Sequence, residues 1–484
     1  MTTSLERWPP EVFEQVLKHL MLDELRNFRL VSKTIAALVA QETFKQYYRT
    51  KHVDVSPRSL RDFVYMTQSG RQGRQIENLI LTGLAVDVAH LQKIVKEKAR
   101  WVTEGNGPLF CSMQHKLSDD ELARAKGNLE ALQQRNVELE QFVGSGADVE
   151  LLAQAFRNIA AFGHRGKLRS LQLQVGVLKE SVDTTVLPVE TRGVSVKWQA
   201  SQGTFRTAMV ALAQSRLPLE KLDAVTEQFH CSLSWRVLDC IRDLPHSGLS
   251  ESLKGLRTLS LSLSADNCTA QQRQEDENAA SVDARSSSRQ RALVDLLAFC
   301  PLLQHLHIHW FMLRSAGYED DSAQRLLHRI AETGLPQSLR SLILRGIRCE
   351  AVTLLRALKG ARVKDLRLEN VHVDESKAAV DGGVGLAGST IGWQEIFAHC
   401  ASSEANMKSL YFDDLWAKRL VHFMDVAGKQ KFPWTPPARG SPILDRKGDD
   451  IRDKIEWYYP SGRPLGSPQA YRWRVLRERE YGPA

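Results

Sequence analysis

Several features that would indicate a membrane, secreted or metal-binding protein are missing from this chain of 484 residues. It has no apolar run near the roughly 20 residues that cross a bilayer, and no N-terminal segment in which basic residues precede an apolar stretch. Its seven cysteines are scattered without a Cys-x-x-Cys pair, which favours buried reduced thiols over disulfides or a zinc knuckle. We therefore expect no membrane association and a location in the cytoplasm or nucleus.

Enzyme motifs are also missing. The chain has no Gly-x-Ser-x-Gly elbow, no Walker loop, no His-Glu-x-x-His helix and no convincing pair of carboxylates. Gly383, Gly385 and Gly388 fit Gly-x-Gly-x-x-Gly, but the nearest expected strand ends well before them, and no acidic residue follows at a suitable distance. We interpret this segment as a loop, and we expect no catalytic residues and no cofactor.

The excess of positive charge is modest. The formal net charge is +8, and residues 429–484 contribute twelve Lys and Arg against seven Asp and Glu. The remaining charge is mixed along the chain. This distribution argues against a dedicated nucleic-acid groove, although an acidic partner stays possible.

The first forty residues carry the clearest helical pattern. Pro9 and Pro10 stand where the first turn of a helix tolerates proline, and Asp23 and Ser32 are suited to cap a second and a third helix. Three such short helices bury little core, so an apolar unit at a chain terminus suggests a docking surface for another protein. The apolar side chains of the first helix recur at helical spacing, at Val12, Phe13, Val16, Leu17 and Leu20.

These residues resemble an F-box of the fungal type. The family pattern is met by residues 8–13, by 16–17, by Leu25 and by 29–33, with departures at Trp8, where leucine is usual, and Ile35, where tryptophan is common. The resemblance implies binding to a Skp adaptor and, through it, to a cullin. The alternative is a helical cap whose apolar stripe packs inward. The residues that the resemblance assigns to the adaptor are Pro9, Pro10, Glu11, Val12, Phe13, Val16, Leu17, Leu20, Leu25, Leu30 and Val31.

A weak repeat, apolar-x-x-Leu-x-apolar, follows the first fifty residues. Each copy ends in the alternation of a strand, and helix-like stretches lie between copies. The middle leucines are irregularly spaced, 24 residues apart at Leu342 and Leu366 but 92 apart at Leu79 and Leu171, against about 20–29 in regular leucine-rich repeats. The copies begin at Ile76, Leu168, Leu256, Leu303, Leu339, Val363 and Met407, with a poorer one at Leu219.

We therefore predict an α/β fold: an N-terminal three-helix F-box followed by an irregular leucine-rich-repeat solenoid with a curved parallel sheet and outer helices. The expected domains are 1–50, the F-box; 51–428, the solenoid, with insertions near 103–147 and 264–290; and 429–484, a basic tail or cap rich in proline and aromatic residues.

The segments between the repeats support this division. We expect 264–290 to be disordered, 373–390 to be a loop, and 117–142 to be a projecting helix or a partner-contact arm. The aromatic residues after 429 predict a segment that folds back over the last repeat. Helices are expected over 89–101, 205–216, 290–299, 323–332, 352–358 and 393–400.

The strand positions opposite the leucines form the expected substrate face. Their mixed charge favours a polar protein epitope over lipid or nucleic acid. Three of them, His305, His307 and His309, share a face that could hold zinc or copper, although ordinary solvent-facing positions are the favoured interpretation. The residues expected to bind substrate are His305, His307, Arg345, Asp365, Arg367, Glu369, Tyr411 and Asp413.

The functional interpretation is a substrate receptor of an SCF-type ubiquitin ligase: the F-box holds the adaptor and the solenoid holds a protein substrate. Two alternatives remain open. One is an F-box scaffold that does not direct ubiquitination, and the other is a repeat-type binder of nucleic acid or an acidic partner.

Overall fold

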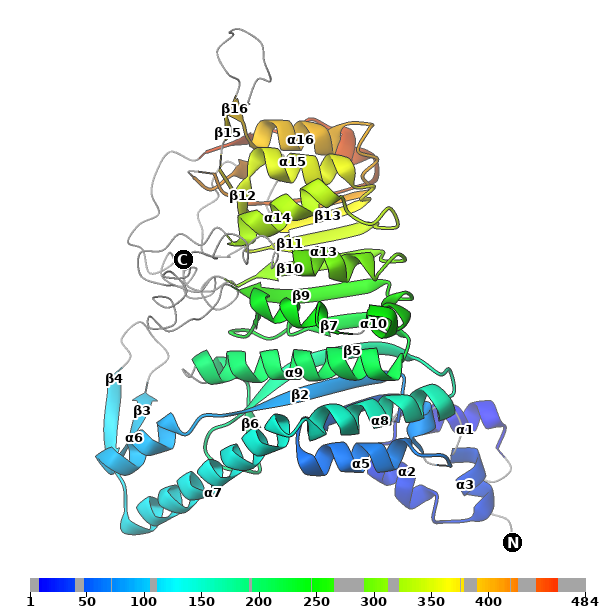
Figure 1. Ribbon diagram of the computed structural model, residues 1–484, viewed down its shortest axis with the longest axis vertical. Coiled ribbons are helices and arrows are strands. Elements are labelled where there is room, and N and C mark those ends of the chain that lie inside the picture. The colour runs from blue at the N-terminus through cyan, green and yellow to red at the C-terminus, as the bar shows by residue number, and fades with distance from the viewer. Residues whose placement is uncertain are drawn as a thin grey trace.

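The computed structural model describes residues 8–39, 48–70, 72–104, 111–190, 194–244, 246–264, 291–311, 322–374, 376–377, 390–417, 419–424 and 441–459. A large, mostly parallel sheet runs through the molecule with helices packed on it, and a group of N-terminal helices lies at the lower end in the view of Figure 1. None of the helices in the described ranges is long and apolar enough to cross a membrane.

Ten strands follow one another across the sheet in chain order, and every neighbouring pair is parallel except the last, which is antiparallel. The order is β1 (Thr50–Asp54), β2 (Asn78–Val86), β5 (Leu168–Leu178), β7 (Leu219–Ala224), β9 (Thr258–Ser264), β10 (His305–Trp310), β11 (Ser341–Arg345), β13 (Asp365–Glu369), β17 (Ser409–Asp413) and β19 (Ile443–Lys447). The predicted parallel sheet is confirmed, and all eight copies of the repeat lie on its strands.

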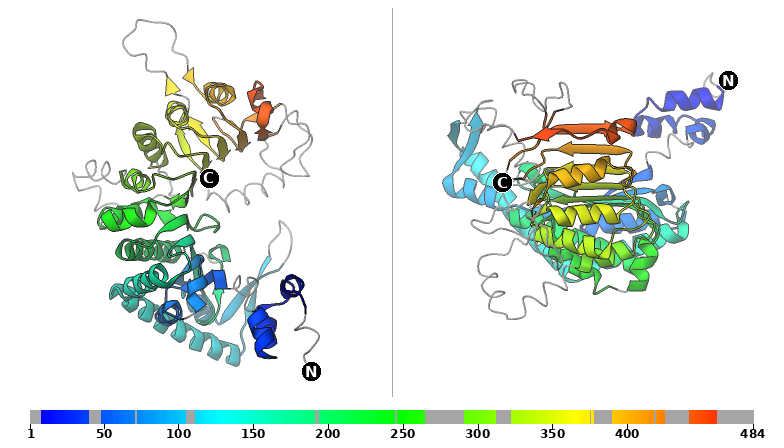
Figure 2. Two further views of the ribbon diagram at one scale, coloured as in Figure 1. Left: turned by 90° about the vertical axis from the view of Figure 1, so that its right-hand side faces the viewer. Right: turned by 90° about the horizontal axis from the view of Figure 1, so that it is seen from above.

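The helices that alternate with these strands cover one face of the sheet. Figure 2 shows them on the outer side of a curved array, with the strands on the inner side. They are α5 (Pro57–Thr67), α8 (Ala147–Phe162), α9 (Val194–Ser215), α10 (His246–Leu253), α13 (Arg291–Ala298), α14 (Ser322–Thr333), α15 (Ala351–Gly360) and α16 (Trp393–Ala401). Five of the six predicted helices overlap them.

The core lies between the sheet and these helices because the leucines of successive repeats align in register. Alternation along a strand sends every second side chain to the same face, so in-register pairing stacks them into continuous rows. The middle row is buried throughout: Leu79, Leu171, Leu222, Leu259, Leu306, Leu342, Leu366 and Leu410.

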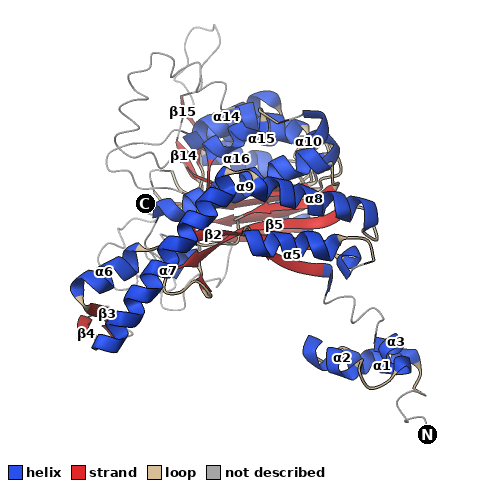
Figure 3. Ribbon diagram, turned by 60° about the horizontal axis from the view of Figure 1, so that its bottom comes forward, coloured by secondary structure: helices blue, strands red, loops and turns tan. Residues whose placement is uncertain are grey.

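An insertion between β2 and α8 extends from one end of the sheet (Figure 3). It comprises α6 (Ala89–Glu97), β3 (Ala99–Glu104), β4 (Cys111–Lys116) and α7 (Asp119–Gly144), with a separate apolar cluster around Leu91, Ile94 and Leu132. The expected helix over 89–101 is wrong in its last four residues, 98–101. Lys98 has φ 49°, in the left-handed region, and this ends α6 before the hairpin of β3 and β4.

The C-terminal part of the described chain folds back on the last repeat. β19 pairs with β17, and η5 (Gly448–Arg452) and β20 (Trp457–Tyr458) follow. Aromatic rings fill this end: Phe397 stacks with Trp393 at 5.3 Å between ring centroids and lies 5.9 Å from Trp457. Residues 460–484 lie outside the described ranges, as do most of the segments expected to be disordered (264–290) or a loop (373–390), including Gly383, Gly385 and Gly388.

Short elements complete the chain. They are η2 (Gln72–Gln75), β6 (Thr185–Val186), η3 (Pro188–Glu190), β8 (Leu233–Ser234), η4 (Trp235–Ile241), β12 (Arg348–Glu350), β14 (His372–Asp374), β15 (Ser376–Lys377), β16 (Thr390–Ile391) and β18 (His422–Phe423).

Candidate interaction sites

The first candidate site is the group of N-terminal helices, α1 (Pro10–Leu17), α2 (Leu22–Phe28) and α3 (Lys33–Val39). Ser32 caps α3 as predicted, because its Oγ accepts a hydrogen bond of 3.1 Å from the amide of Ile35. The prediction that Asp23 caps α2 is wrong. That helix already begins at Leu22, and the amide of Met21 donates to Glu24 Oε2 at 2.7 Å.

These helices have an apolar cluster of their own, separate from the core of the sheet. Phe13 stacks on Phe28 with 5.8 Å between ring centroids, and Leu20 and Trp8 pack against the cluster from its rim. Three of the residues that the resemblance assigned to the adaptor, Phe13, Leu17 and Leu25, lie inside this cluster with Ile35 and Val39.

A second set of the assigned residues is exposed. Leu30 is 83% exposed and Val31 60%, and both lie in the turn between α2 and α3. Val12 and Val16 lie four residues apart on α1 and are also exposed, as are Pro9 and Glu11. Large apolar side chains gathered on so short a segment mark a surface suited to burial by another protein. The structure thus divides the assigned residues into a core set and a surface set.

The second candidate site lies on the inner face of the sheet, over the four successive strands β11, β13, β17 and β19. Parallel register places Arg345 beside Glu369 and then Asp413 in one row, and it places Arg367 beside Tyr411 in the row before. Neighbouring strands are about 4.8 Å apart, so these side chains are in mutual contact range. We call Arg345, Arg367, Glu369, Tyr411 and Asp413 the charged cluster.

Glu369 is the centre of the charged cluster. Its side chain is only 5% exposed and is held by two guanidinium groups: Arg345 Nε lies 2.6 Å from Glu369 Oε2, and Arg367 forms an ion pair with Oε1. Burial alone raises the pKa of the Glu369 carboxyl, but the charges and hydrogen bonds of Arg345 and Arg367 outweigh it and hold the pKa below its usual range. Glu369 is therefore ionised at neutral pH and fixes the direction of both arginines.

The outer part of the charged cluster is more accessible. The guanidinium of Arg367 lies 4.5 Å from the ring centroid of Tyr411, and the Tyr411 hydroxyl donates to Asp413 Oδ2 at 3.5 Å. Asp445 of β19 is the register partner of Tyr411 and is exposed. Asp445 was not among the residues predicted to bind substrate, because its strand belongs to the segment expected only to be a tail or cap.

The histidines of β10 differ in their surroundings. His305 is exposed and lies beside Thr258 and Ser341, away from the charged cluster. His307 is half-buried, and burial together with the charges of Arg345 and Arg367 lowers its pKa to about 4. It is therefore neutral at physiological pH.

His309 is buried, and its Nδ1 lies 3.1 Å from Ser262 Oγ. The expected shared face of the three histidines therefore does not give three equivalent imidazoles. Within the described ranges, no group of three or more His, Cys, Asp or Glu side chains is arranged to hold a metal ion.

The polar rows continue over the strands nearer the N-terminus, where β7 contributes Lys221 and Asp223. Gln174 donates to Thr82 Oγ1 at 2.8 Å, and the hydroxyl of Ser170 donates to Asn78 Oδ1 at 2.7 Å. Asp365 is half-buried beside Ser341, in the same row as His305. The inner face is therefore a hydrogen-bonding surface that carries charges of both signs.

Comparison with known proteins identifies one domain. Residues 5–47 match the F-box domain, and the match includes α1, α2 and α3. F-box domains bind Skp-type adaptors. No curated protein matches the chain.

Proposed function

We propose that this protein is the substrate receptor of an SCF-type cullin-RING ubiquitin ligase and works in the cytoplasm or nucleus. Its N-terminal helices bind the Skp adaptor, and its sheet, which we interpret as an irregular leucine-rich-repeat solenoid, binds a protein substrate. The observation that carries the proposal is the F-box match at residues 5–47, together with the large apolar side chains that the same helices leave exposed.

Under this proposal the chain supplies no catalytic residues. It brings a substrate and the ligase into one complex, so that ubiquitin transfer takes place at a high effective concentration. The inner face of the sheet suits a protein substrate because it offers hydrogen-bonding groups and charges of both signs, with Glu369 compensating Arg345 and Arg367.

Adaptor binding is tested on the surface set of the N-terminal helices. We expect Val16→Glu combined with Leu30→Glu to abolish co-purification with the Skp adaptor, because two charges would enter an apolar interface. Leu302→Glu is the matched control: Leu302 is also an exposed leucine, but it lies in the turn before β10. Undiminished adaptor binding by the double variant would contradict the proposal.

Substrate binding is tested on the charged cluster. We expect Arg367→Ala combined with Asp445→Ala to remove proteins captured by the wild-type chain in affinity purification with mass spectrometry, while the adaptor is retained. Arg348→Ala combined with Asp374→Ala is the matched control, because this exposed Arg–Asp pair lies on β12 and β14. An unchanged list of captured proteins would place the substrate site elsewhere.

Ligase activity is tested separately. If the chain directs ubiquitination, cullin co-purifies with it and its substrates have longer half-lives when the N-terminal helices carry Val16→Glu and Leu30→Glu. Adaptor binding without cullin, or unchanged half-lives, would support the scaffold alternative instead.

A further inference from the structure

A ladder of basic residues crosses the sheet at the edge where the parallel strands begin. The residue before each strand from β9 to β17 donates a main-chain hydrogen bond to the carbonyl of the corresponding residue on the previous strand. The donor–acceptor distances are 2.7–2.8 Å for the amides of Arg257, Gln304, Arg340, Lys364 and Lys408. The residues joined in this way are Glu220, Arg257, Gln304, Arg340, Lys364 and Lys408. We call Arg257, Arg340, Lys364 and Lys408 the basic ladder.

The repeat itself directs these side chains into solvent. In each copy the residue before the basic one is buried, as Leu256, Leu339 and Val363 are, and alternation turns the next side chain away from the core. Arg340 and Lys408 are accordingly exposed, and Lys364 is half-buried. Because the hydrogen bonds fix the backbone, the Cα positions of Arg340, Lys364 and Lys408 follow one another at the spacing of the strands, about 4.8 Å, while Gln304 separates Arg257 from Arg340.

From β1 to β7, at the same edge, carboxylates compensate the charges of the basic side chains. Arg49 Nε and Arg165 Nε lie 3.8 Å and 3.9 Å from Glu77 Oε1. Lys167 donates to Glu220 Oε1 at 2.5 Å, and this hydrogen bond, with the charges of Lys167, Arg257 and Arg169, lowers the pKa of Glu220. Carboxylates thus alternate with cations from β1 to β7.

From β11 to β17 the described residues provide no such compensation. Among the residues that the structure describes, Arg340, Lys364 and Lys408 form no ion pair. The edge becomes mixed again only at its upper limit, where the amide of Gly448 donates to Lys408 O and the exposed Asp449 and Asp450 follow. From β9 to β17 the edge therefore carries four positive charges along about 19 Å, given the strand spacing, with the neutral Gln304 at β10 between the first and the second.

The length and spacing of the basic ladder fit an acidic helix. Residues three or four apart on one face of a helix are separated along its axis by about 4.5–6 Å, which brackets the strand spacing, whereas alternate residues of an extended chain are about 6.6–6.8 Å apart. We propose that the basic ladder binds an acidic helical segment of a partner protein, about 13 residues long. The proposal does not depend on adaptor binding by α1 to α3.

The surrounding charges favour such a segment over nucleic acid. The row next to the ladder carries Asp365 beside Lys364, and Glu77 and Glu220 interrupt the edge lower down. A phosphate backbone that continued along the edge would meet Glu77 and Glu220, whereas a helix confined to the basic ladder ends before them. Binding should weaken as salt is added, because the contacts are exposed ion pairs.

The test measures fluorescence anisotropy with a labelled helical peptide of about 18 residues, rich in alanine and glutamine, with glutamates on one face at every third or fourth position. A second peptide has the same composition with the glutamates distributed around the helix, and a DNA duplex of similar length is the third probe. We expect the full-length wild-type chain to bind the first peptide most tightly. We expect Arg340→Glu combined with Lys364→Glu to weaken this binding at least tenfold.

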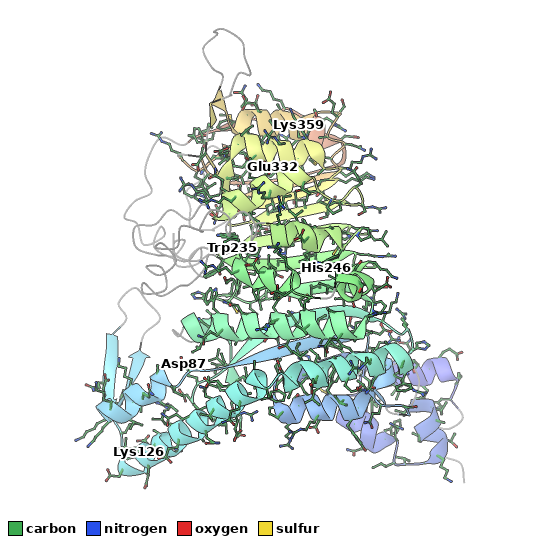
Figure 4. The ribbon with its side chains drawn as sticks, viewed as in Figure 1. Asp87, Lys126, Trp235, His246, Glu332 and Lys359 are labelled. Atoms are coloured by element: carbon green, nitrogen blue, oxygen red, sulfur yellow. The ribbon has the colours of Figure 1, made fainter. Side chains whose placement is uncertain are left out.

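Lys96→Glu combined with Lys126→Glu is the matched control, with an equal change in net charge on α6 and α7. Lys126 is labelled at the lower tip of the insertion in Figure 4. We expect this control to bind within twofold of wild type. No binding by wild type, an equal loss in both double variants, equal binding of the two peptides, or tighter binding of DNA through Arg340 and Lys364 would each overturn the proposal.

Discussion

The charged cluster on the inner face makes a sharp prediction about stability. Glu369→Gln keeps the shape of the side chain but removes the charge that holds Arg345 and Arg367. Because Glu369 is 5% exposed and Arg345 Nε lies 2.6 Å from its carboxylate, the variant removes a buried negative charge that lies next to a half-buried cation. Breaking a buried pair in this way costs about 3–5 kcal/mol, and we expect about 2–4 kcal/mol here because Arg367 is half-exposed and can be hydrated.

The measurement is urea unfolding of the full-length chain, followed by circular dichroism, with the midpoint converted to a free energy of unfolding. Asp374→Asn is the control, because Arg348 Nε lies 2.9 Å from Asp374 Oδ2 but both side chains are 49% exposed. We expect that substitution to cost less than about 1 kcal/mol. If the two substitutions cost the same, burial does not govern the strength of the Glu369 ion pairs and the reasoning is refuted.

Three further predictions follow from other parts of the structure. The pKa of His307 is about 4 in the folded chain and about 6.5 in the unfolded chain, so between these pH values only the unfolded chain binds the proton. The free energy of unfolding should therefore fall by up to about 3 kcal/mol from pH 6.5 to pH 4. His307→Gln should remove this part of the pH dependence of the urea midpoint, and an unchanged pH dependence would contradict the prediction. A Cβ on Gly248 would lie 2.1 Å from the carbonyl oxygen of Ala213, so Gly248→Ala should destabilise the protein by about 1–3 kcal/mol. A Cβ on Gly203 of α9 would have no described atom within 4 Å, so Gly203→Ala should stabilise the protein slightly. Equal melting temperatures of the two variants would refute this contrast. Phe13→Ala should destabilise the N-terminal helices by about 3–5 kcal/mol and make residues 8–39 sensitive to limited proteolysis, whereas Val16→Glu should not. Protection of Phe13→Ala equal to that of wild type would show that Phe13 does not stabilise these helices.

The parallel sheet was predictable because its repeat couples two patterns. Leu342 and Leu366 each lie between apolar positions at strand spacing, and the helices between such copies have apolar stripes of their own. Alternation alone then assigned Arg345, Arg367 and Glu369 to one face, and the register of β11 and β13 places them together. The pattern did not predict β19, because this single antiparallel strand is not part of a repeat.

The adaptor residues show where a motif stops being informative. The resemblance selects the positions of a family pattern, but a pattern does not separate side chains that build the small core from those that remain exposed. Phe13 and Val16 lie on the same helix three residues apart, yet only Phe13 turns inward against Phe28. The end of α6 was missed for a different reason: Trp101 continues the apolar spacing of the helix, but the left-handed backbone at Lys98 has already ended it.

The reversed direction of β19 also bears on how copies of this protein behave in a crowded solution. The ten strands that follow one another across this twelve-stranded sheet end in β1 and β19, and such an edge strand is a potential template for pairing with another chain. Here both edge strands are only five residues long, and each displays charge: Lys51 and Asp54 on β1, Asp445 and Lys447 on β19. The two edge strands are short and charged, and β19 runs in the direction opposite to the other strands. They therefore offer a second copy no continuous apolar strand with which to pair, so the sheet can be wide without polymerising.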